Sequence, residues 1–183
     1  MIGRFSSLPT MNFTITTSNL ILRDFTPSDV EHYVDQCQDP KYQRYYNEED
    51  CSIEKSTQLA NMFIEQALES PRTQYHLAIQ CKFSGCYLGL AALRLEQKNQ
   101  ASIGCGLARN RQGKGVAEEA MLALVNYGFS QLDVKRVYAE TLSSNKAAIR
   151  LCKRVGMSID CERTNDRFFR DKWWSTTVLH MTR

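Results

Sequence analysis

The sequence lacks the features that mark membrane-spanning, disulfide-rich or zinc-binding, and secreted proteins. Its 183 residues contain no apolar run approaching the ~20 residues that a membrane-spanning helix needs. The seven cysteines include no CxxC pair and are odd in number, which argues against a disulfide framework or a structural zinc site. Residues 1–11 lack the sustained apolar core of a secretory signal. We therefore expect reduced thiols and a cytoplasmic protein.

A large excess of charge of one sign is also missing. Lys and Arg number 23 and Asp and Glu 20, and the net charge of +3 is too small to indicate a nucleic-acid-binding face. No repeat, linker or low-complexity segment divides the sequence, whose 43% hydrophobic and 23% charged content is ordinary for a globular domain. We predict one domain over residues 13–183, preceded by a poorly ordered extension over residues 1–12.

Apolar spacing and turn residues predict an alternation of strands and helices, and hence one α/β domain. Thr26, Pro27 and Asp29 form a capping-box start for the first helix, which ends near residue 39. Asn145 is favoured as the N-cap of the last helix and Gly156 as its terminator. The predicted strands cover residues 19–23, 75–80, 86–93, 101–107, 136–141, 158–163 and 175–181. The predicted helices follow residues 26, 52, 115 and 145, and residues 41–50 are expected to form a loop.

Two glycines stand directly before a strongly helical run in residues 110–120, which read Asn-Arg-Gln-Gly-Lys-Gly-Val-Ala-Glu-Glu-Ala. Glycine lets the backbone approach a ligand closely, and the start of a helix offers unpaired N–H groups and the positive end of its dipole. The segment therefore predicts a cradle for an anion, most naturally a phosphate. A Walker loop is excluded because Ala108 and Gly115 occupy its two defining ends. A dinucleotide fingerprint is excluded because Arg109 and Glu118 occupy its third-glycine positions.

Together with three other segments, this glycine loop resembles the GNAT superfamily of N-acetyltransferases, in the branch of the ribosomal-protein N-terminal acetyltransferases. The family's acetyl-CoA loop reads Q/R-x-x-G-x-G/A before a helix, and residues 110–115 match both glycines while Asn110 departs from the Q/R position. The other matching segments resemble the branch's first strand and helix start, its central strand and its second CoA-contacting helix. They are residues 20–29 (LILRDFTPSD), 103–107 (IGCGL) and 145–157 (NKAAIRLCKRVGM), within a similarity that covers about residues 17–181.

The resemblance implies a mixed, mainly antiparallel twisted sheet of about seven strands flanked by about four helices, with a splay between the fourth and fifth predicted strands. The acetyl-pantetheine arm of acetyl-CoA, the implied cosubstrate, would enter this splay, and its pyrophosphate would lie on main-chain N–H groups of the glycine loop. On the residues alone, Arg111 and Lys114 equally suit solvated loop positions, and Gly106 suits a bulge or packing site. The residues implied to contact acetyl-CoA are Gly106, Leu107, Arg111, Gln112, Gly113, Lys114, Gly115, Val116, Ala117, Asn145 and Ile149.

Two side chains are candidates for the proton transfers of the implied reaction. Many family members carry tyrosine, as proton donor, at the helix position that Cys152 occupies here, and a free thiol with a pKa of about 8.5 is able to donate a proton. Cys152 equally suits a small buried core position with solvent as the donor, and a ping-pong route through acetyl-Cys152 is the less favoured alternative. Glu140, on the strand bordering the splay, is the candidate base, or else an exposed strand carboxylate.

Other titratable residues carry weaker predictions. Glu96, Asp160 and Glu162 are lesser candidates for the base, and His76 and His180 are expected to be packed histidines. No cluster of His, Cys, Asp or Glu has metal-ligand spacing, so we expect no metal.

The implied reaction is direct transfer of the acetyl group to a primary amine, either a protein N-terminal α-amine or a small amine. Two aromatic clusters are candidates for the acceptor groove, although such residues are as readily core or subunit contacts. The clusters are Tyr42, Tyr45 and Tyr46, and Phe168, Phe169, Trp173 and Trp174. Two alternatives stay open, namely non-catalytic acyl-CoA binding or sensing on the same fold, and binding of a nucleotide phosphate. We expect no nucleic-acid or membrane partner, and a monomer or homodimer.

Overall fold

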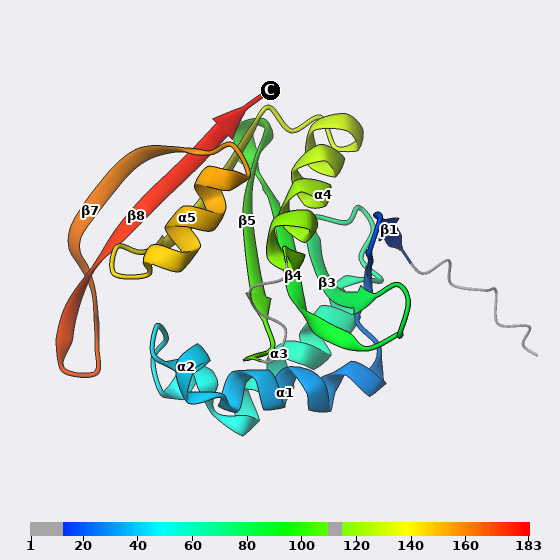
Figure 1. The fold of residues 1–183 in the computed structure, drawn as a ribbon, viewed down its shortest axis with the longest axis horizontal. Coiled ribbons are helices and arrows are strands. Elements are labelled where there is room, and N and C mark those ends of the chain that lie inside the picture. Colours follow the sequence, from blue (N-terminus) through cyan, green and yellow to red (C-terminus); the bar gives the residue numbers. More distant parts are fainter. Residues whose placement is uncertain (1–12, 110–114) are drawn as a thin grey trace, which may run out of the picture.

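One eight-stranded sheet organises the protein, whose structure is a computed structural model that describes residues 13–109 and 115–183 (Figure 1). The strands lie in the order β1-β2-β3-β4-β5-β6-β8-β7, and every neighbouring pair is antiparallel except β5 with β6. The strands are β1 (Thr14–Thr16), β2 (Leu20–Asp24), β3 (Gln74–Cys81), β4 (Tyr87–Glu96), β5 (Gln100–Leu107), β6 (Arg136–Leu142), β7 (Ser158–Phe169) and β8 (Lys172–Thr182). The α-helices are α1 (Val30–Gln38), α2 (Pro40–Gln43), α3 (Ile53–Gln66), α4 (Val116–Gln131) and α5 (Lys146–Arg154).

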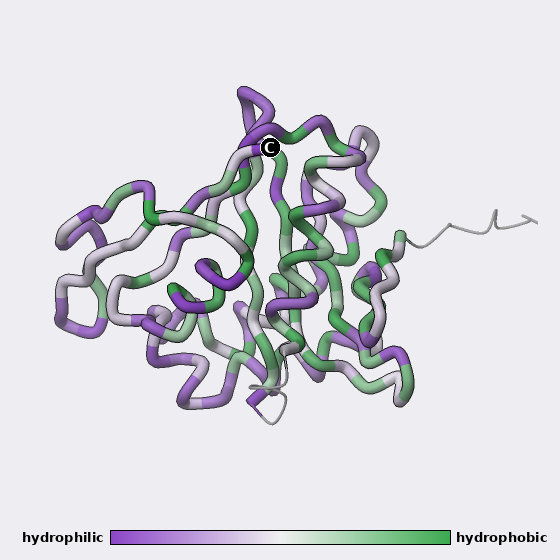
Figure 2. Tube along the Cα trace, turned by 45° about the horizontal axis from the view of Figure 1, so that its top comes forward, coloured by the Kyte–Doolittle hydropathy of each residue, from purple (hydrophilic) through white to green (hydrophobic). Residues whose placement is uncertain are grey.

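The two faces of the sheet carry separate hydrophobic clusters. Successive side chains of a strand point to opposite faces, and on β3 Leu77 and Ile79 join the larger cluster with α4 and α5, whereas Ala78 joins the smaller one. Phe63 of α3 and Tyr33 of α1 complete that smaller cluster. The tube is mainly green along the central strands, where both clusters meet the sheet (Figure 2). The predicted single α/β domain with a mainly antiparallel sheet is confirmed.

The sheet opens between β5 and β6. These strands run parallel and pair over only three residue positions, the last being Ser102 with Tyr138. Beyond that point β5 continues alongside β4, and β6 continues alongside β8. Within the described part of the chain, the facing edges of residues 103–107 and 139–142 therefore carry backbone N–H and C=O groups without a strand partner on that side. This opening is the predicted splay.

Local capping interactions place the helix ends as predicted. Thr26 N–H donates to Asp29 Oδ2 at 2.8 Å, which closes the box before α1. Asn145 Oδ1 accepts from Ala148 N–H at 3.2 Å at the start of α5. Gly156 has a φ of +100° and ends that helix in the region that favours glycine.

Two segments near the N-terminal end are more ordered than predicted. The predicted loop 41–50 contains part of α2, because Asp39 Oδ1 accepts from Lys41 N–H at 2.8 Å and Pro40 fills the first helical position. β1 adds an edge strand that pairs with β2. None of the helices within the described ranges combines the length and apolar character needed to span a membrane.

The last two strands form a longer hairpin than predicted. A two-residue turn, Arg170 and Asp171, joins β7 to β8, and its φ values are +53° and +52°. Such a turn matches the right-handed twist of a hairpin, but its usual residues are glycine and asparagine. With this turn, β7 extends beyond residue 163, its predicted end, and β8 begins before residue 175, its predicted start.

Candidate active site

The splay opens into a cavity of about 290 Å³. The end of β5 lies on one side of it, the start of α4 and one side of α5 on another, and α2 with the residues that follow it on a third. Four residues predicted to contact acetyl-CoA meet here, and they are Gly106, Leu107, Ala117 and Asn145. The other lining residues are Lys41, Tyr42, Arg44, Tyr45, Tyr46, Cys105, Ala147, Ala148, Leu151 and Arg154.

Leu107 presents its N–H to the open edge of β5. Leu107 lies opposite Gly89 of β4, and the next residue, Ala108, donates its N–H to Leu88 O at 3.0 Å. Because backbone N–H groups alternate between the two sides of a strand, the N–H of Leu107 points away from β4 and toward β6. A main-chain donor therefore points into the opening, and its contact with the thioester oxygen stays a prediction.

α4 begins beside this edge with N–H groups that its own turns do not use. Gly115 has a φ of +74°, which favours glycine, and the helix starts at Val116. Glu119 N–H makes the first helical bond, to Gly115 O at 3.0 Å, so the three preceding N–H groups have no acceptor within the helix. The carboxylate of Glu118 is 2.8 Å from Arg154 Nε. The predicted residues Arg111, Gln112, Gly113 and Lys114 lie outside the described residues.

Glu119, the second acid of this first turn, binds the β1–β2 turn. Its Oε1 accepts from Thr17 Oγ1 at 2.6 Å and from Asn19 N–H at 2.8 Å, and its Oε2 accepts from Asn19 Nδ2 at 2.9 Å. These bonds lower the pKa of the carboxyl group, although desolvation acts against them. These hydrogen bonds therefore fix the start of α4 to the β1–β2 turn near the N-terminal end of the described chain.

α5 lines the cavity with one of its sides. Asn145 caps this helix, as predicted, and also lines the cavity, while its contact with the cofactor stays a prediction. The half-buried side chain of Ile149 packs against the core and is not among the described lining residues. Ala148, Leu151 and Arg154 line the cavity and were missed. Their spacing of three residues from Asn145 onward, which places side chains on one side of a helix, is the pattern that identifies them.

Cys152 belongs to the core. Its side chain is 4% exposed within the larger hydrophobic cluster, and it is not among the described lining residues of the cavity. Burial raises the pKa of its thiol to about 11. Cys105, which does line the cavity, has its pKa raised to about 12 by burial and by the Cys152 thiol. Both groups are therefore protonated at neutral pH, a state that permits proton donation and suppresses nucleophilic attack by a thiolate.

Glu140 is held by two arginines of β7. Its Oε2 accepts from Arg163 Nη2 at 2.8 Å and from Arg167 Nη2 at 3.1 Å. Glu140 is not among the described residues that line this cavity. Its role as a base stays a prediction. Within residues 13–109 and 115–183, no group of three or more His, Cys, Asp or Glu could hold a metal ion.

His76 is a packed histidine, as predicted. Its ring is 4% exposed and stacks on Phe63 with centroids 4.2 Å apart. Arg94 Nε donates to His76 Nε2 at 3.1 Å, so Nδ1 carries the proton and donates to Gln66 Oε1 at 2.9 Å. Burial and the neighbouring guanidinium of Arg94 lower the pKa of this imidazole to about 3.

The two aromatic clusters lie in different surroundings. Tyr42 and Tyr46 stack with centroids 5.0 Å apart and line the cavity. Phe168 and Trp173 are 57% and 56% exposed near the tip of the β7–β8 hairpin. Arg170 at this tip donates to the backbone oxygen of Tyr46 at 3.2 Å, which brings the hairpin against the segment after α2.

Comparisons with known proteins agree with this geometry. Residues 19–158 match the model of the acetyltransferase (GNAT) domain. An uncharacterised N-acetyltransferase of Bacillus licheniformis is 25% identical over 162 residues, which cover 84% of this chain and 90% of the relative. A ribosomal L7/L12 α-N-protein acetyltransferase, solved in complex with coenzyme A, has a TM-score of 0.81 at 17% identity. The matched region covers 93% of this chain and 98% of that protein's chain. A spermidine N-acetyltransferase from Vibrio cholerae, solved with coenzyme A and spermine, has a TM-score of 0.75 at 17% identity. The matched region covers 91% of this chain and 96% of that protein's chain.

Proposed function

The chain belongs to the GNAT family of acetyltransferases, and from this premise we propose that it transfers the acetyl group of acetyl-CoA directly to a primary amine. The observation that carries the proposal is the cavity at the splay. Three kinds of group converge there, namely the N–H of Leu107 at an open strand edge, the start of α4 and the side chain of Asn145. Each suits a different part of acetyl-CoA.

The chemistry of the lining fits this cosubstrate. A pantetheine arm carries amide groups, which the open edge of β5 and Asn145 are able to bind. A pyrophosphate requires N–H donors and positive charge, which the start of α4 and Arg154 supply. We propose that Arg111 and Lys114 add charge to the same end of the site. Two solved structures of the same fold hold coenzyme A, which supports the assignment.

Acetyl transfer needs a neutral amine, a polarised thioester carbonyl and a proton for the leaving thiolate. We assign polarisation of the carbonyl to the N–H of Leu107. The proton has two candidate sources, the Cys152 thiol and solvent, and the burial of Cys152 in the core favours solvent. The raised pKa of Cys152 also disfavours an acetyl-cysteine intermediate. Glu140 stays the candidate base, acting through water.

The charges of the cavity bear on the acceptor. Its charged lining residues, among those described, are Lys41, Arg44 and Arg154, and all three are cationic. Cationic walls repel a polyamine, whereas they tolerate an amine on a molecule of low positive charge. We therefore infer that the acceptor is a peptide N-terminal α-amine or a small amine of low positive charge, unlike the spermine in the Vibrio cholerae structure.

Filling the cavity tests the proposal. Ala148→Phe places a ring in the lining, and Arg150→Phe places the same ring on an exposed part of the same helix outside it. We expect Ala148→Phe to weaken acetyl-CoA binding, measured by calorimetry, and to lower kcat/KM for CoA release by at least about tenfold, or ~1.4 kcal/mol. Arg150→Phe is expected to stay within about threefold of the wild type. Failure of the wild-type protein to bind acetyl-CoA would overturn the assignment.

One observation favours a second candidate, a non-catalytic acyl-CoA binding module. Neither side chain predicted for proton transfer lines the cavity, since Cys152 is in the core and Glu140 is paired with two arginines. Tight binding of acetyl-CoA without CoA release, across a panel of peptides, amino amides and small amines, would select this candidate over the enzyme.

A further inference from the structure

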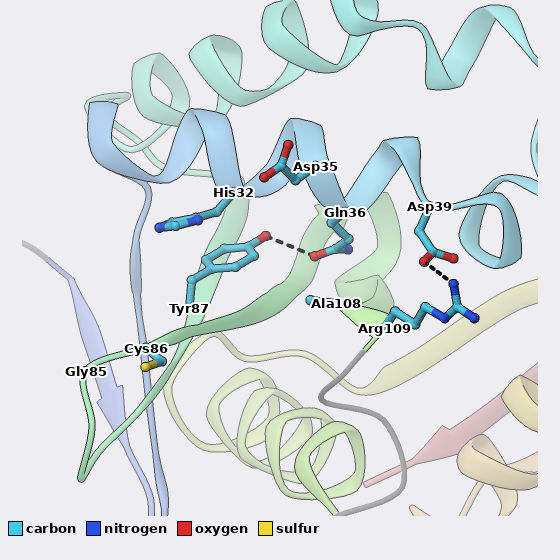
Figure 3. A pocket seen from close by; sticks show the side chains of 9 residues that line it. All are labelled: His32, Asp35, Gln36, Asp39, Gly85, Cys86, Tyr87, Ala108 and Arg109. Carbon is cyan, nitrogen blue, oxygen red and sulfur yellow. Dashed lines mark hydrogen bonds and ion pairs between the residues drawn. The ribbon is translucent and has the colours of Figure 1, made fainter.

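A second cavity, of about 790 Å³, lies between α1 and the neighbouring ends of β4 and β5 (Figure 3). Side chains of α1 form one wall, and Tyr87 with the residues that follow β5 forms the other (Figure 3). Arg109 lies at one end, with its guanidinium 3.5 Å from Asp39. The lining residues are His32, Asp35, Gln36, Asp39, Gly85, Cys86, Tyr87, Ala108 and Arg109.

Gln36 is the buried polar side chain of this cavity, and it is 3% exposed. Its Oε1 accepts from the Tyr87 hydroxyl at 3.1 Å (Figure 3). Its Nε2 is also buried and has no hydrogen-bond partner among the residues that the structure describes. Buried amide N–H groups normally have partners, because an unsatisfied donor loses its bond to water without replacement. The two N–H donors of Nε2 are therefore available to a ligand.

This amide lies against the strand that carries the acyl-transfer position. A Cβ built on Gly106 would stand 3.0 Å from Gln36 Nε2 and 3.0 Å from Tyr42 Oη. Gly106 permits this approach because it has no side chain. The N–H of Leu107 lies at the edge of β5 toward β6, whereas Gln36 meets the face of β5 on the side of α1 and α2. The two donors therefore address different parts of the reacting complex.

We propose that Gln36 determines acceptor specificity, its Nε2 donating a hydrogen bond to a carbonyl oxygen of the acceptor next to the reacting amine. The proposal rests on the acetyl transfer proposed above. An α-amino amide, as at the N-terminus of a peptide, carries a carbonyl two bonds from its amine nitrogen and fits this arrangement. A polyamine has no such oxygen and would leave both donors of Gln36 unpaired, which a buried site penalises.

The charge of the wall that α1 forms, which also carries Gln36, supports this substrate class. Asp35 contributes a carboxylate to the lining, and Asp39 a second one that Arg109 partly neutralises. An approaching ammonium group is attracted by this side of the cavity before it loses its proton. This wall therefore disfavours an amine with a carboxylate or phosphate beside the reacting group.

A set of matched acceptors separates this role from a purely structural one. L-alaninamide carries the carbonyl, alaninol replaces it with a hydroxyl, and 2-aminopropane has no oxygen. Rates are compared at equal concentrations of the neutral amine, because the three amines titrate differently. Gln36→Met keeps the side-chain length without donors, Gln36→Glu replaces the donor with an acceptor, and Glu31→Gln on the exposed side of α1 is the control.

We expect the wild type to prefer alaninamide to 2-aminopropane by at least about tenfold in kcat/KM, with alaninol in between. Gln36→Met is expected to remove this preference by raising KM for alaninamide, while the rate with 2-aminopropane and the Kd for acetyl-CoA stay within about threefold. Gln36→Glu is expected to do the same, and Glu31→Gln to change nothing. An alaninol rate equal to that of alaninamide would refute the carbonyl assignment.

The remaining outcomes each decide a separate point. Equal use of all three amines by the wild type, or an equal loss for all three in Gln36→Met, would overturn the role of Gln36 and leave the proposed acetyl transfer intact. Loss of folding in both Gln36 variants, read from thermal melting, would make Gln36 structural and also overturn it. Absence of CoA release with every acceptor would refute the proposed function itself, and the inference with it.

Discussion

The packed imidazole of His76 makes the stability of the folded chain depend on pH. Its pKa is about 3 in the folded state against an ordinary value of 6.5 for histidine, because burial and the Arg94 guanidinium oppose the charged form. Between these two values the unfolded chain binds more protons than the folded chain. The free energy of unfolding therefore falls as the pH drops below about 6.5, and this contribution is fully present only above it.

The magnitude follows from the distance between the working pH and the unfolded pKa. At about pH 5 the unfolded histidine is protonated and the folded one is not, over roughly 1.5 pH units at about 1.4 kcal/mol each. The ring is 4% exposed, so solvent screening reduces this little. We expect His76 to account for a loss of about 2 kcal/mol of stability between about pH 7.5 and about pH 5.

Urea unfolding at the two pH values measures this loss, and a variant isolates the histidine from the carboxylates that titrate in the same range. His76→Gln lacks the titrating group, so its stability is expected to fall by about 2 kcal/mol less than that of the wild type over this interval. His32→Gln, which removes an exposed histidine of α1, is the control and is expected to follow the wild type. Equal losses in wild type and His76→Gln would refute the reasoning, as would an NMR titration of His76 near pH 6.5.

Three further substitutions test the contacts around the site. Gly106→Ala places a methyl group 3.0 Å from Gln36 Nε2, and we expect it to lower kcat/KM at least about tenfold and to cost about 1–3 kcal/mol of unfolding free energy, measured in urea. Glu119→Ala removes three hydrogen bonds between α4 and the β1–β2 turn and is expected to cost about 1–2 kcal/mol in the same assay, whereas an unchanged midpoint would show that these bonds contribute nothing. Cys152→Ala is expected to leave kcat within about threefold, because the burial of this thiol favours solvent as the proton source, and a fall of about a hundredfold would instead assign the transfer to this thiol.

Local rules predicted the parts of the fold whose causes lie within a few residues. Thr26 and Asp29 are three positions apart, and Asn145 caps the helix that starts at the next residue, so spacing alone identifies both caps. The same rule, applied to Asp39 and Pro40, would also have found α2. It was overlooked because the tyrosine- and asparagine-rich residues that follow are typical of a loop.

Features that depend on distant contacts did not follow from the sequence. The splay came from the resemblance, because nothing in residues 103–107 shows which neighbour the strand lacks. The contact between Gln36 and Gly106 joins a helix to a strand 70 positions later, and no spacing rule relates them. The long hairpin was missed because Arg170 and Asp171 adopt a turn that usually contains glycine or asparagine.

The three-residue pairing of β5 with β6 has a consequence for the cohesion of the whole molecule. In the part of the chain that the structure describes, the strands β1 to β5 and the strands β6 to β8 are joined only by this ladder of three residue pairs, which forms a seam between two halves of the sheet. A bound molecule with amide groups along the gap would form hydrogen bonds with both halves, in place of the strand-to-strand hydrogen bonds that the described strands β5 and β6 do not make there. Binding of such a molecule should therefore raise the melting temperature. It should also slow amide hydrogen exchange most strongly in the residues that border this seam.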